Sequence, residues 1–177
     1  LDLYNSHFGA FDPDGEYLGS ANQLLRNIGH GVFVDVTTPE LEANTGLSHH
    51  PAWADIDNDG LPDLFVTQSP NISGTERSVM LHQDSIGVFS NITDEGLLQG
   101  FSPRGIGWQD INNDGLVDLL IAVSAGDSTN LMKNCMLMNE GGGTFVRDAL
   151  LFADVYKESR SVGWCDYNND NLPDVYI

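Results

Sequence analysis

Acidic side chains recur at fixed short spacing in three stretches of the sequence. In the first stretch, Asp55, Asp57, Asp59 and Asp63 surround a turn at Gly60. Clustered carboxylates repel one another unless a cation lies between them, and calcium accepts six to eight oxygen ligands at loose geometry. Alternate side chains of a coiled loop, with one backbone carbonyl, can surround such an ion. The spacing therefore predicts a calcium-binding loop at residues 55–63.

The same pattern recurs at residues 110–118 and 166–174, with Asn replacing Asp at the third loop position. An amide oxygen is a neutral ligand, so we expect weaker binding in these two loops than in the first. Gly60 permits the left-handed backbone of the sharp turn, and Asn171 is the tolerated replacement in the third loop. We expect about one calcium ion per complete loop. The predicted ligands, which include the backbone carbonyl of each leucine, are Asp55, Asp57, Asp59, Leu61, Asp63, Asp110, Asn112, Asp114, Leu116, Asp118, Asp166, Asn168, Asp170, Leu172 and Asp174.

Other readings of these loops fit less well. Magnesium demands a tight octahedral shell that is seldom built wholly from protein, and zinc prefers His or Cys ligands. An EF-hand needs a Glu at loop position 12 and helices on both sides. Position 12 here is Val66, Ile121 or Ile177, each within a strand-like run. The metal-free alternative is an Asp/Asn-rich turn that is held by side-chain hydrogen bonds to the backbone.

The loops belong to a repeat of about 55 residues, which is the strongest organising feature of the sequence. The first Asp of the loop steps from 55 to 110 to 166. A tryptophan lies two residues before each loop: Trp53, Trp108 and Trp164. A phenylalanine keeps the same period: Phe33, Phe89 and Phe145. We expect these aromatic residues in the core. Residues 1–4 match the closing residues 62–65 of a loop, so the sequence is expected to begin and end inside repeats of a longer array.

Within each unit the apolar pattern is that of short strands. Residues 105–108 lead into the second loop, and the apolar run 119–123 leads out of it. Two more strands, at 135–138 and 144–146, flank a hairpin turn whose counterparts are at 29–31 and 84–87. Four short strands per repeat predict an all-β fold of β-propeller-type blades, each with about four antiparallel strands. Roughly three repeats would make a partial propeller.

The repeat phase also gives unit boundaries. A partial blade at 1–37 contains the end of a calcium loop and outer strands, and complete blades follow at 38–93, with loop 55–63, and 94–149, with loop 110–118. The start of a further blade, with loop 166–174, lies at 150–177.

The sequence also predicts the local structure of two segments that connect the main strands. Residues 37–47 are the modest helix candidate, where we expect an inter-blade loop with about one helical turn. Residues 11–15 predict a turn in a lengthened hairpin, with a second metal site as the alternative.

Charge and cysteine content narrow the function classes. The 177 residues include 26 Asp+Glu against 7 Lys+Arg, a formal net charge of −19 that disfavours nucleic acid and anionic lipid as partners. No apolar run is long enough for a membrane span. Cys135 and Cys165 fit either one disulfide or two buried free thiols. Sequons at Asn71 and Asn91 fit N-glycosylation in a eukaryotic secretory host.

Three cations share one repeat position, because His49, Arg104 and Arg160 all lie four residues before the repeat tryptophan. We expect a structural role there, with the cation stacked on the tryptophan or paired with a loop carboxylate. The alternative is ligand binding on the propeller face. His82 sits in no recognisable motif, and no Ser/His/Asp arrangement stands out, so we expect that the protein is not an enzyme.

The loop pattern and the strand that follows it resemble the FG-GAP/VCBS repeat family, which includes the propellers of integrin α-chains and many secreted relatives. Residues 22–37 and 104–110 are similar to the ASPIC/UnbV and cartilage acidic protein branch. The resemblance covers essentially the whole chain. It implies a seven-bladed or similar propeller in the parent protein and calcium between the first two strands of each blade. It also implies an extracellular or cell-surface location.

These features together predict an extracellular calcium-binding propeller module that serves as a recognition or adhesion scaffold. The expected partners are a protein or glycan ligand and further repeats of the parent chain, without nucleic acid and without membrane insertion. One alternative is the propeller part of a polysaccharide-active enzyme, such as a lyase, which needs a basic, aromatic-lined groove. Another is a lectin whose sugars bind between blades.

Overall fold

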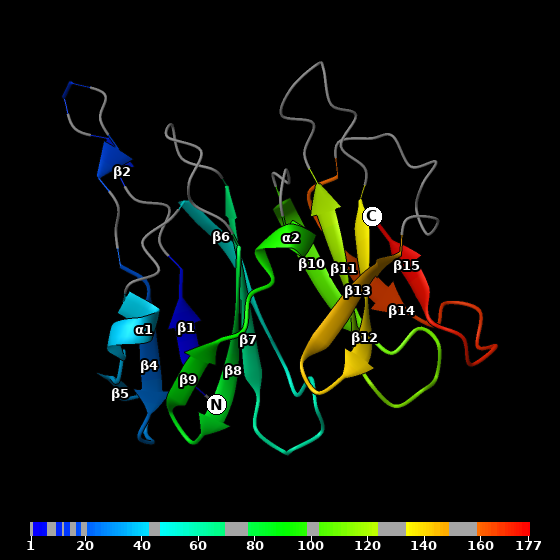
Figure 1. Cartoon of the computed structure of the whole chain (residues 1–177). Helices are drawn as coiled ribbons and strands as arrows, with labels where there is room; N and C mark the ends of the chain where they lie inside the picture. The colour runs from blue at the N-terminus through cyan, green and yellow to red at the C-terminus, as the bar shows by residue number, and fades with distance from the viewer. Residues whose placement is uncertain are drawn as a thin grey trace.

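The fold is known from a computed structural model of the whole chain (Figure 1). The structure describes residues 2–6, 10–11, 13–14, 17–18, 21–42, 47–69, 78–98, 103–123, 134–148 and 159–177. Within these residues, the strands form five separate antiparallel sheets, and two one-turn helices lie in the connections.

Four of the sheets follow one another as blades, which we number in chain order. The first blade has the strands β1 (Leu3–Asn5), β4 (Gln23–Asn27) and β5 (Phe33–Asp35). The second blade has the strands β6 (Leu47–Ala54), β7 (Asp63–Ser69), β8 (Val79–Ser85) and β9 (Val88–Asn91). The third blade has the strands β10 (Pro103–Gln109), β11 (Asp118–Val123), β12 (Cys135–Gly141) and β13 (Thr144–Asp148). The fourth blade pairs β14 (Gly163–Cys165) with β15 (Asp174–Tyr176).

Each complete blade is a meander in which consecutive strands pair antiparallel, in the order β6-β7-β8-β9 and β10-β11-β12-β13. The predicted all-β fold of propeller-type blades is therefore confirmed. The predicted strands of the third repeat lie within β10, β11, β12 and β13. The three predicted hairpin turns lie between the last two strands of the first three blades.

The remaining elements lie in the connections. A small hairpin of β2 (Ala10–Phe11) and β3 (Tyr17–Leu18) extends from the first blade, and Pro13 and Asp14 form a turn between its strands. The predicted turn is thus confirmed, whereas the alternative metal site there also needs Asp12, which lies outside the described residues. The predicted single helical turn is α1 (Pro39–Glu42). A second turn, α2 (Glu95–Leu98), occupies the same place one repeat later and was not predicted.

The core lies between neighbouring blades, where the apolar faces of two sheets meet. Strand β11 is buried along its whole length, because the third blade has neighbours on both faces. The residues buried between the first and second blades are Tyr4, Leu24, Leu41, Leu64, Val66, Leu81 and Phe89. Those buried between the second and third blades are Ile56, Phe65, Met80, Leu119, Ile121, Val123, Cys135, Leu137 and Phe145.

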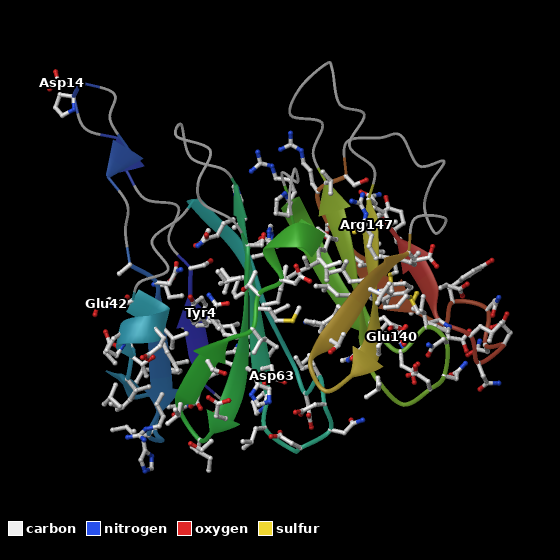
Figure 2. The ribbon with its side chains drawn as sticks, viewed as in Figure 1. Tyr4, Asp14, Glu42, Asp63, Glu140 and Arg147 are labelled. Carbon is white, nitrogen blue, oxygen red and sulfur yellow. The ribbon has the colours of Figure 1, made fainter. Side chains whose placement is uncertain are left out.

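The repeat tryptophans join each blade to the one before it. Trp53 on β6 lies edge-on to Tyr4 of the first blade, with ring centroids 6.4 Å apart, and contacts Phe89 of its own blade at 6.1 Å. Figure 2 shows Tyr4 at this junction between the sheets. The third blade repeats the arrangement around Trp108, which lies 6.4 Å from Phe65 and 6.0 Å from Phe145.

The expected core position of the phenylalanines is confirmed for Phe89 and Phe145 and is wrong for Phe33, which is 43% exposed. Phe89 and Phe145 each contact the tryptophan of their own inner strand. The described part of the first blade contains no such strand, so Phe33 has no tryptophan against which to pack.

Both cysteines are free thiols. Cys135 is buried on β12, and burial raises the pKa of its thiol to about 11. Cys165 is exposed, so the expectation of two buried thiols holds for one of them. In the described part of the chain, no helix is long and apolar enough to cross a membrane.

Candidate metal centres

Each Asp-rich loop joins the innermost strand of a blade to the second strand. Residues 55–62 connect β6 to β7, residues 110–117 connect β10 to β11, and residues 166–173 connect β14 to β15. The first two loops lie at the same end of the molecule as the β8–β9 and β12–β13 hairpins (Figure 1). Asp63, labelled in Figure 2, lies at this end. Two antiparallel strands therefore fix both ends of each loop.

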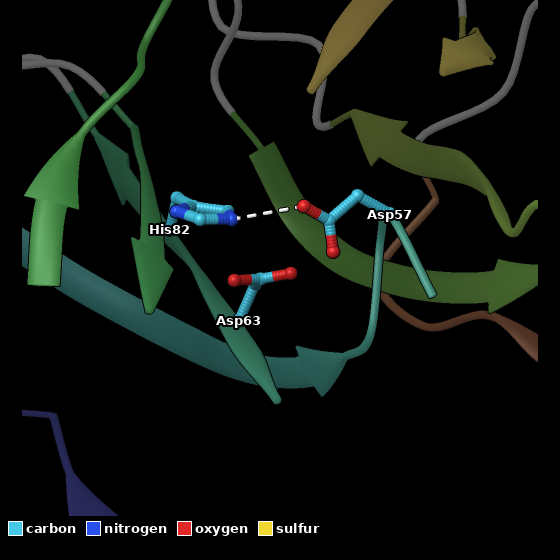
Figure 3. A group of neighbouring side chains, drawn as sticks. All are labelled: Asp57, Asp63 and His82. Carbon is cyan, nitrogen blue, oxygen red and sulfur yellow. Dashed lines mark hydrogen bonds and ion pairs between the residues drawn. The ribbon is translucent and has the colours of Figure 1, made fainter. Parts of the chain in front are cut away.

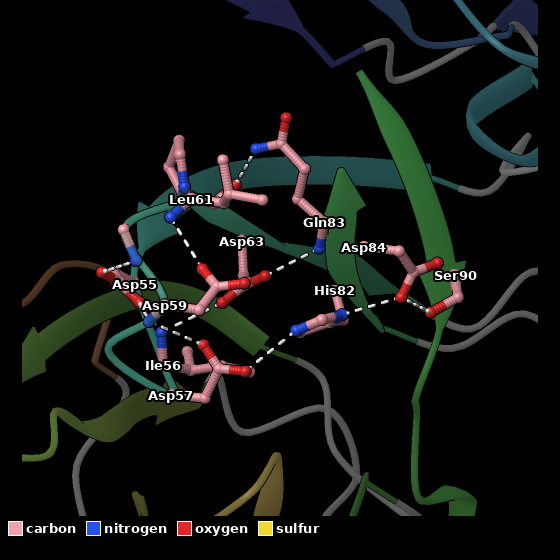
Figure 4. A network of polar contacts seen from close by, with 12 residues as sticks. Asp55, Ile56, Asp57, Asp59, Leu61, Asp63, His82, Gln83, Asp84 and Ser90 are labelled. Carbon is pink, nitrogen blue, oxygen red and sulfur yellow. Dashed lines mark hydrogen bonds and ion pairs between the residues drawn. The ribbon is translucent and has the colours of Figure 1, made fainter. Parts of the chain in front are cut away.

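The backbone of the first loop curls around its own carboxylates (Figure 4). Asp55 accepts the N–H of Asp59 through Oδ1 at 3.1 Å and the N–H of Gly60 through Oδ2 at 2.9 Å. Asp59 Oδ1 accepts the N–H of Leu61 at 2.7 Å. Gly60 has a φ of 88°, as the predicted left-handed turn requires.

The other two loops repeat this geometry. The N–H of Gly115 lies 2.9 Å from Asp110 Oδ2, and the N–H of Asn171 lies 2.8 Å from Asp166 Oδ2. Asn171 has a φ of 68°, which confirms that Asn replaces the glycine in its left-handed conformation. An unpredicted second left-handed position occurs two residues earlier in each loop, with φ near 60° at Asn58, Asn113 and Asn169. Asn at the same place in all three loops was the available signal.

The geometry of the first loop fits a calcium ion. One carboxylate oxygen from each of Asp55, Asp57 and Asp59 lies within 4.8 Å of the other two. Calcium binds oxygen at about 2.3–2.6 Å, so ligands on opposite sides of one ion lie up to about 5 Å apart. The acidic cluster that the sequence indicated is therefore present, and its three carboxylates can serve as ligands of one ion.

In the second and third loops, the leucine and asparagine residues that were predicted as ligands contact the middle carboxylate of their own loop. Leu116 and Leu172 donate their N–H to Asp114 and Asp170, each at 2.8 Å. The amides of Asn112 and Asn168 contact the same two carboxylates at 2.8 and 2.9 Å. These two loops thus combine two aspartates with one amide where the first loop has three aspartates.

The closing aspartate of each loop has a role that the sequence did not indicate. Asp63 is 2% exposed, and its Oδ2 accepts the N–H of Ile56 at 3.0 Å. Its Oδ1 accepts the N–H of Gln83 on the third strand of the blade at 2.8 Å. Burial raises the pKa of Asp63. This carboxylate therefore ties the loop to the sheet, and its oxygens retain lone pairs for an ion.

The same connection recurs in the other blades. Asp118 is fully buried, and it accepts the N–H of Ile111 at 3.1 Å and that of Asn139 at 2.8 Å. Burial raises the pKa of Asp118 as well. Asp174 accepts the N–H of Tyr167 at 3.1 Å. In the first blade, Asp2 accepts the N–H of Asn27 at 2.8 Å, as expected for the closing residue of a loop.

His82 is a residue of the site that sequence reasoning missed. From β8, its Nε2 contacts Asp57 Oδ2 at 3.0 Å (Figure 3), and its other nitrogen contacts Asp84 at 2.9 Å (Figure 4). The hydrogen bond to Asp84 raises the pKa of the imidazole, and the bond to Asp57 acts in the same direction. Asp57, Asp63 and His82 form a second close cluster. The matching residues of the other blades are Arg26 and Met138, so no repeat pattern marked this position.

The cation position before the tryptophan forms a contact between blades. Arg104 on β10 lies 2.6 Å, Nη1 to Nε2, from His49 on β6. Burial, with the charge of Arg104, lowers the pKa of His49 to about 4, so the neutral ring accepts the hydrogen bond. The expected partner was a tryptophan or a loop carboxylate. The observed contact, which the sequence did not predict, joins two residues at the same repeat position in neighbouring blades.

Comparison with known proteins agrees with the repeat. A family model for the FG-GAP-like repeat matches residues 8–66 and 110–177, and these spans contain all three Asp-rich loops. A search of curated proteins gives no match. The narrower likeness to the ASPIC/UnbV branch stays a prediction.

Proposed function

The chain belongs to the FG-GAP-like repeat family, and on that premise we propose that it is a calcium-binding propeller module of an extracellular or cell-surface protein. The observation that carries this proposal is the carboxylate cluster of the first loop, with its oxygens within 4.8 Å of one another. The same backbone arrangement around the first Asp occurs in all three loops.

Calcium has an architectural role in this proposal. The ion neutralises carboxylates that the loop brings together, and it thereby fixes the connection between the first two strands of a blade. The chain carries a formal net charge of −19, so bound cations also relieve repulsion across the whole molecule.

The module serves as a recognition scaffold for a protein or a glycan, without a catalytic role. Support comes from the tie between each loop and its sheet: Asp63 and Asp118 each accept two backbone N–H groups. Such carboxylates suit a rigid cation site better than proton transfer. Two binding assays on the calcium-loaded protein separate the two partner classes. One uses a glycan array, and the other uses a panel of extracellular proteins.

Thermal unfolding with calcium and with EDTA tests the calcium part. A site whose Kd is one-tenth of the free calcium concentration stabilises the fold by about 1.4 kcal/mol. Each kcal/mol shifts the melting temperature of a chain this long by about 2–4 °C. We therefore expect three loops to raise it by roughly 10 °C, and magnesium at equal concentration to raise it far less.

Two variants accompany this test. Asp59→Asn removes a carboxylate from the first loop and should reduce the calcium response. Asp94→Asn removes an exposed carboxylate outside the loops and should leave the response intact. A melting temperature that is the same in calcium and in EDTA would overturn the proposal.

A further inference from the structure

The loops of the second and third blades are joined by hydrogen bonds through Asn139, which is buried, and by one exposed hydrogen bond between their tips. We propose that loop 55–63 and loop 110–118 bind calcium cooperatively, because Asn139 of the third blade holds the backbone of both. The inference rests on the proposed calcium binding and adds a regulatory property to it.

Asn139 is 2% exposed and contacts both loops. Its side-chain Nδ2 donates to the carbonyl of Ile56 in the first loop at 2.7 Å and to that of Val117 in the second at 3.2 Å. Its backbone N–H donates to Asp118, the closing carboxylate of the second loop, at 2.8 Å. One residue of β12 therefore fixes the position of two loops that lie in different blades.

The peptide groups around Ile56 are held from both sides. Its N–H donates to Asp63, the closing carboxylate of its own loop, at 3.0 Å, whereas its carbonyl accepts from Asn139. The Ile56 side chain is fully buried in the core between the two blades. A continuous series of hydrogen bonds thus runs from Asp63 through Ile56 and Asn139 to Asp118.

A second contact joins the tips of the two loops. The side chain of Asn58 donates to the carbonyl of Gly115 at 2.9 Å. The N–H of Gly115 in turn donates to Asp110, the first carboxylate of the second loop, at 2.9 Å. Both Asn58 and Gly115 have positive φ, so each is fixed in a conformation that the loop turn requires.

Cooperativity follows because each loop must be ordered to bind an ion. Calcium in loop 55–63 fixes Ile56 and Asn58, and their contacts then order part of loop 110–118. Binding of the second ion therefore causes a smaller loss of conformational entropy. The coupling is reciprocal, and couplings between sites typically change affinity by about 5–150-fold. With two contacts between the loops, we expect the lower end, about five-fold.

The test uses the amide signals of two glycines as separate reporters of the two loops. Asp166→Asn with Asp170→Asn first removes carboxylates from the third loop. Calcium titration of the glycine-labelled protein, followed by NMR, then gives the half-saturation concentration of loop 55–63 from Gly60 and of loop 110–118 from Gly115. Adding Asp110→Asn and Asp114→Asn should weaken binding at Gly60 about five-fold.

Two variants locate the coupling. Asn139→Ala removes the buried contact, and Asn58→Gly removes the contact at the tips while it keeps the positive φ. The quantity compared is the half-saturation concentration at Gly60 with and without the second-loop substitutions. In Asn139→Ala, their five-fold ratio should fall toward one, and in Asn58→Gly it should decrease. Gln83→Ala is the matched control, because Gln83 holds the position of Asn139 one blade earlier and its described hydrogen bonds stay within its own blade. It should leave the dependence at five-fold.

The outcomes separate the two proposals. If neither glycine responds to calcium, the proposed function fails. If both respond but the second-loop substitutions leave the half-saturation concentration at Gly60 unchanged, the cooperativity is refuted. It is refuted equally if the five-fold dependence persists in both Asn139→Ala and Asn58→Gly. Should Asn139→Ala fail to fold, Asn58→Gly decides the matter, since its exposed substitution leaves the core intact.

Discussion

At the scale of single residues, the closing carboxylates Asp63 and Asp118 carry two structural bonds each. A buried carboxylate that accepts two backbone N–H groups is stabilised without a metal ion, because both oxygens have donors. These two aspartates therefore contribute to the fold and to the candidate ion site at the same time, and the two contributions can be measured separately.

Asp118→Asn tests the structural contribution. The amide group of Asn would face the N–H of either Ile111 or Asn139, so one buried donor loses its acceptor. We expect a loss of about 1–3 kcal/mol in the free energy of unfolding by urea, measured in EDTA. Asp114→Asn, at an exposed loop position, should change stability little in EDTA and should weaken the stabilisation by calcium. Equal losses for both variants in EDTA would contradict this assignment.

His49 gives the fold a dependence on pH. The folded protein binds a proton at this ring with a pKa of about 4, whereas the unfolded chain binds it with a pKa near 6.5. Between these values the unfolded state holds more protons, so stability falls as pH decreases from about 6.5 to 4. His49→Gln should reduce the slope of unfolding free energy against pH in this window. An unchanged slope would show that the histidine is not the group responsible.

At the scale of elements, the first loop also packs onto the next blade. Ile56 at its second position is fully buried between the second and third blades. Tyr167 holds the matching position of the third loop and is 76% exposed. The first loop is thus part of a blade interface in addition to being a candidate ion site.

Ile56→Ala should therefore cost much more than Tyr167→Ala. Truncation of a buried isoleucine typically costs about 2–5 kcal/mol, because contacts are lost and a cavity remains. Substitution of an exposed side chain usually stays within about 0.5 kcal/mol. Urea unfolding of the two variants in EDTA measures the difference. Similar small losses would show that the loop does not depend on the neighbouring blade.

At the scale of the whole molecule, the third and fourth blades lie very close together where their inner strands run side by side. A Cβ at Gly105 on β10 would lie 2.6 Å from the Cα of Ser161, which leads into β14. A Cβ at Gly107 would lie 2.7 Å from Val162. Glycine at these two positions therefore sets how closely the third and fourth blades can pack.

Gly105→Ala should force the two blades apart, because the obstructing atoms belong to the backbone and cannot rotate away. Overpacking of this kind costs about 1–3 kcal/mol. Gly163→Ala is the control, since a Cβ there meets no atom within 4 Å. Urea unfolding followed by tryptophan fluorescence, which includes Trp164 at this interface, measures both. Equal stability of the two variants would refute the close approach.

Buried polar pairs also join the blades. Asn22 donates to the hydroxyl of Ser48 at 3.1 Å, and Asn134 donates to that of Ser159 at 3.1 Å. The two pairs occupy the same repeat positions and link the first blade to the second and the third to the fourth. Between the second and third blades the matching inner-strand residue is Pro103, which has no hydroxyl. Asn139, Asn58 and the Arg104–His49 pair supply polar contacts at that interface instead.

The sequence alone determined the strands, the turns and the acidic loops, because each of these depends on residues within about ten positions of one another. The repeat followed because the same local pattern recurs every 55 or 56 residues. Alternating apolar runs and Asn or Gly at turns encode local backbone geometry. A 56-residue step also leads from α1 to α2, so the repeat in the sequence contains the position of this second helical turn as well.

Only the tertiary structure decided what the loops touch. The partners of the closing aspartates on the third strand lie 20 and 21 residues away, and Asn139 lies 83 residues from Ile56. His82 reaches Asp57 from a neighbouring strand, and Ile56 is buried against the third blade. These contacts arise when the chain folds back into sheets and the sheets stack, and a local residue pattern carries no record of which distant backbone group will arrive beside it.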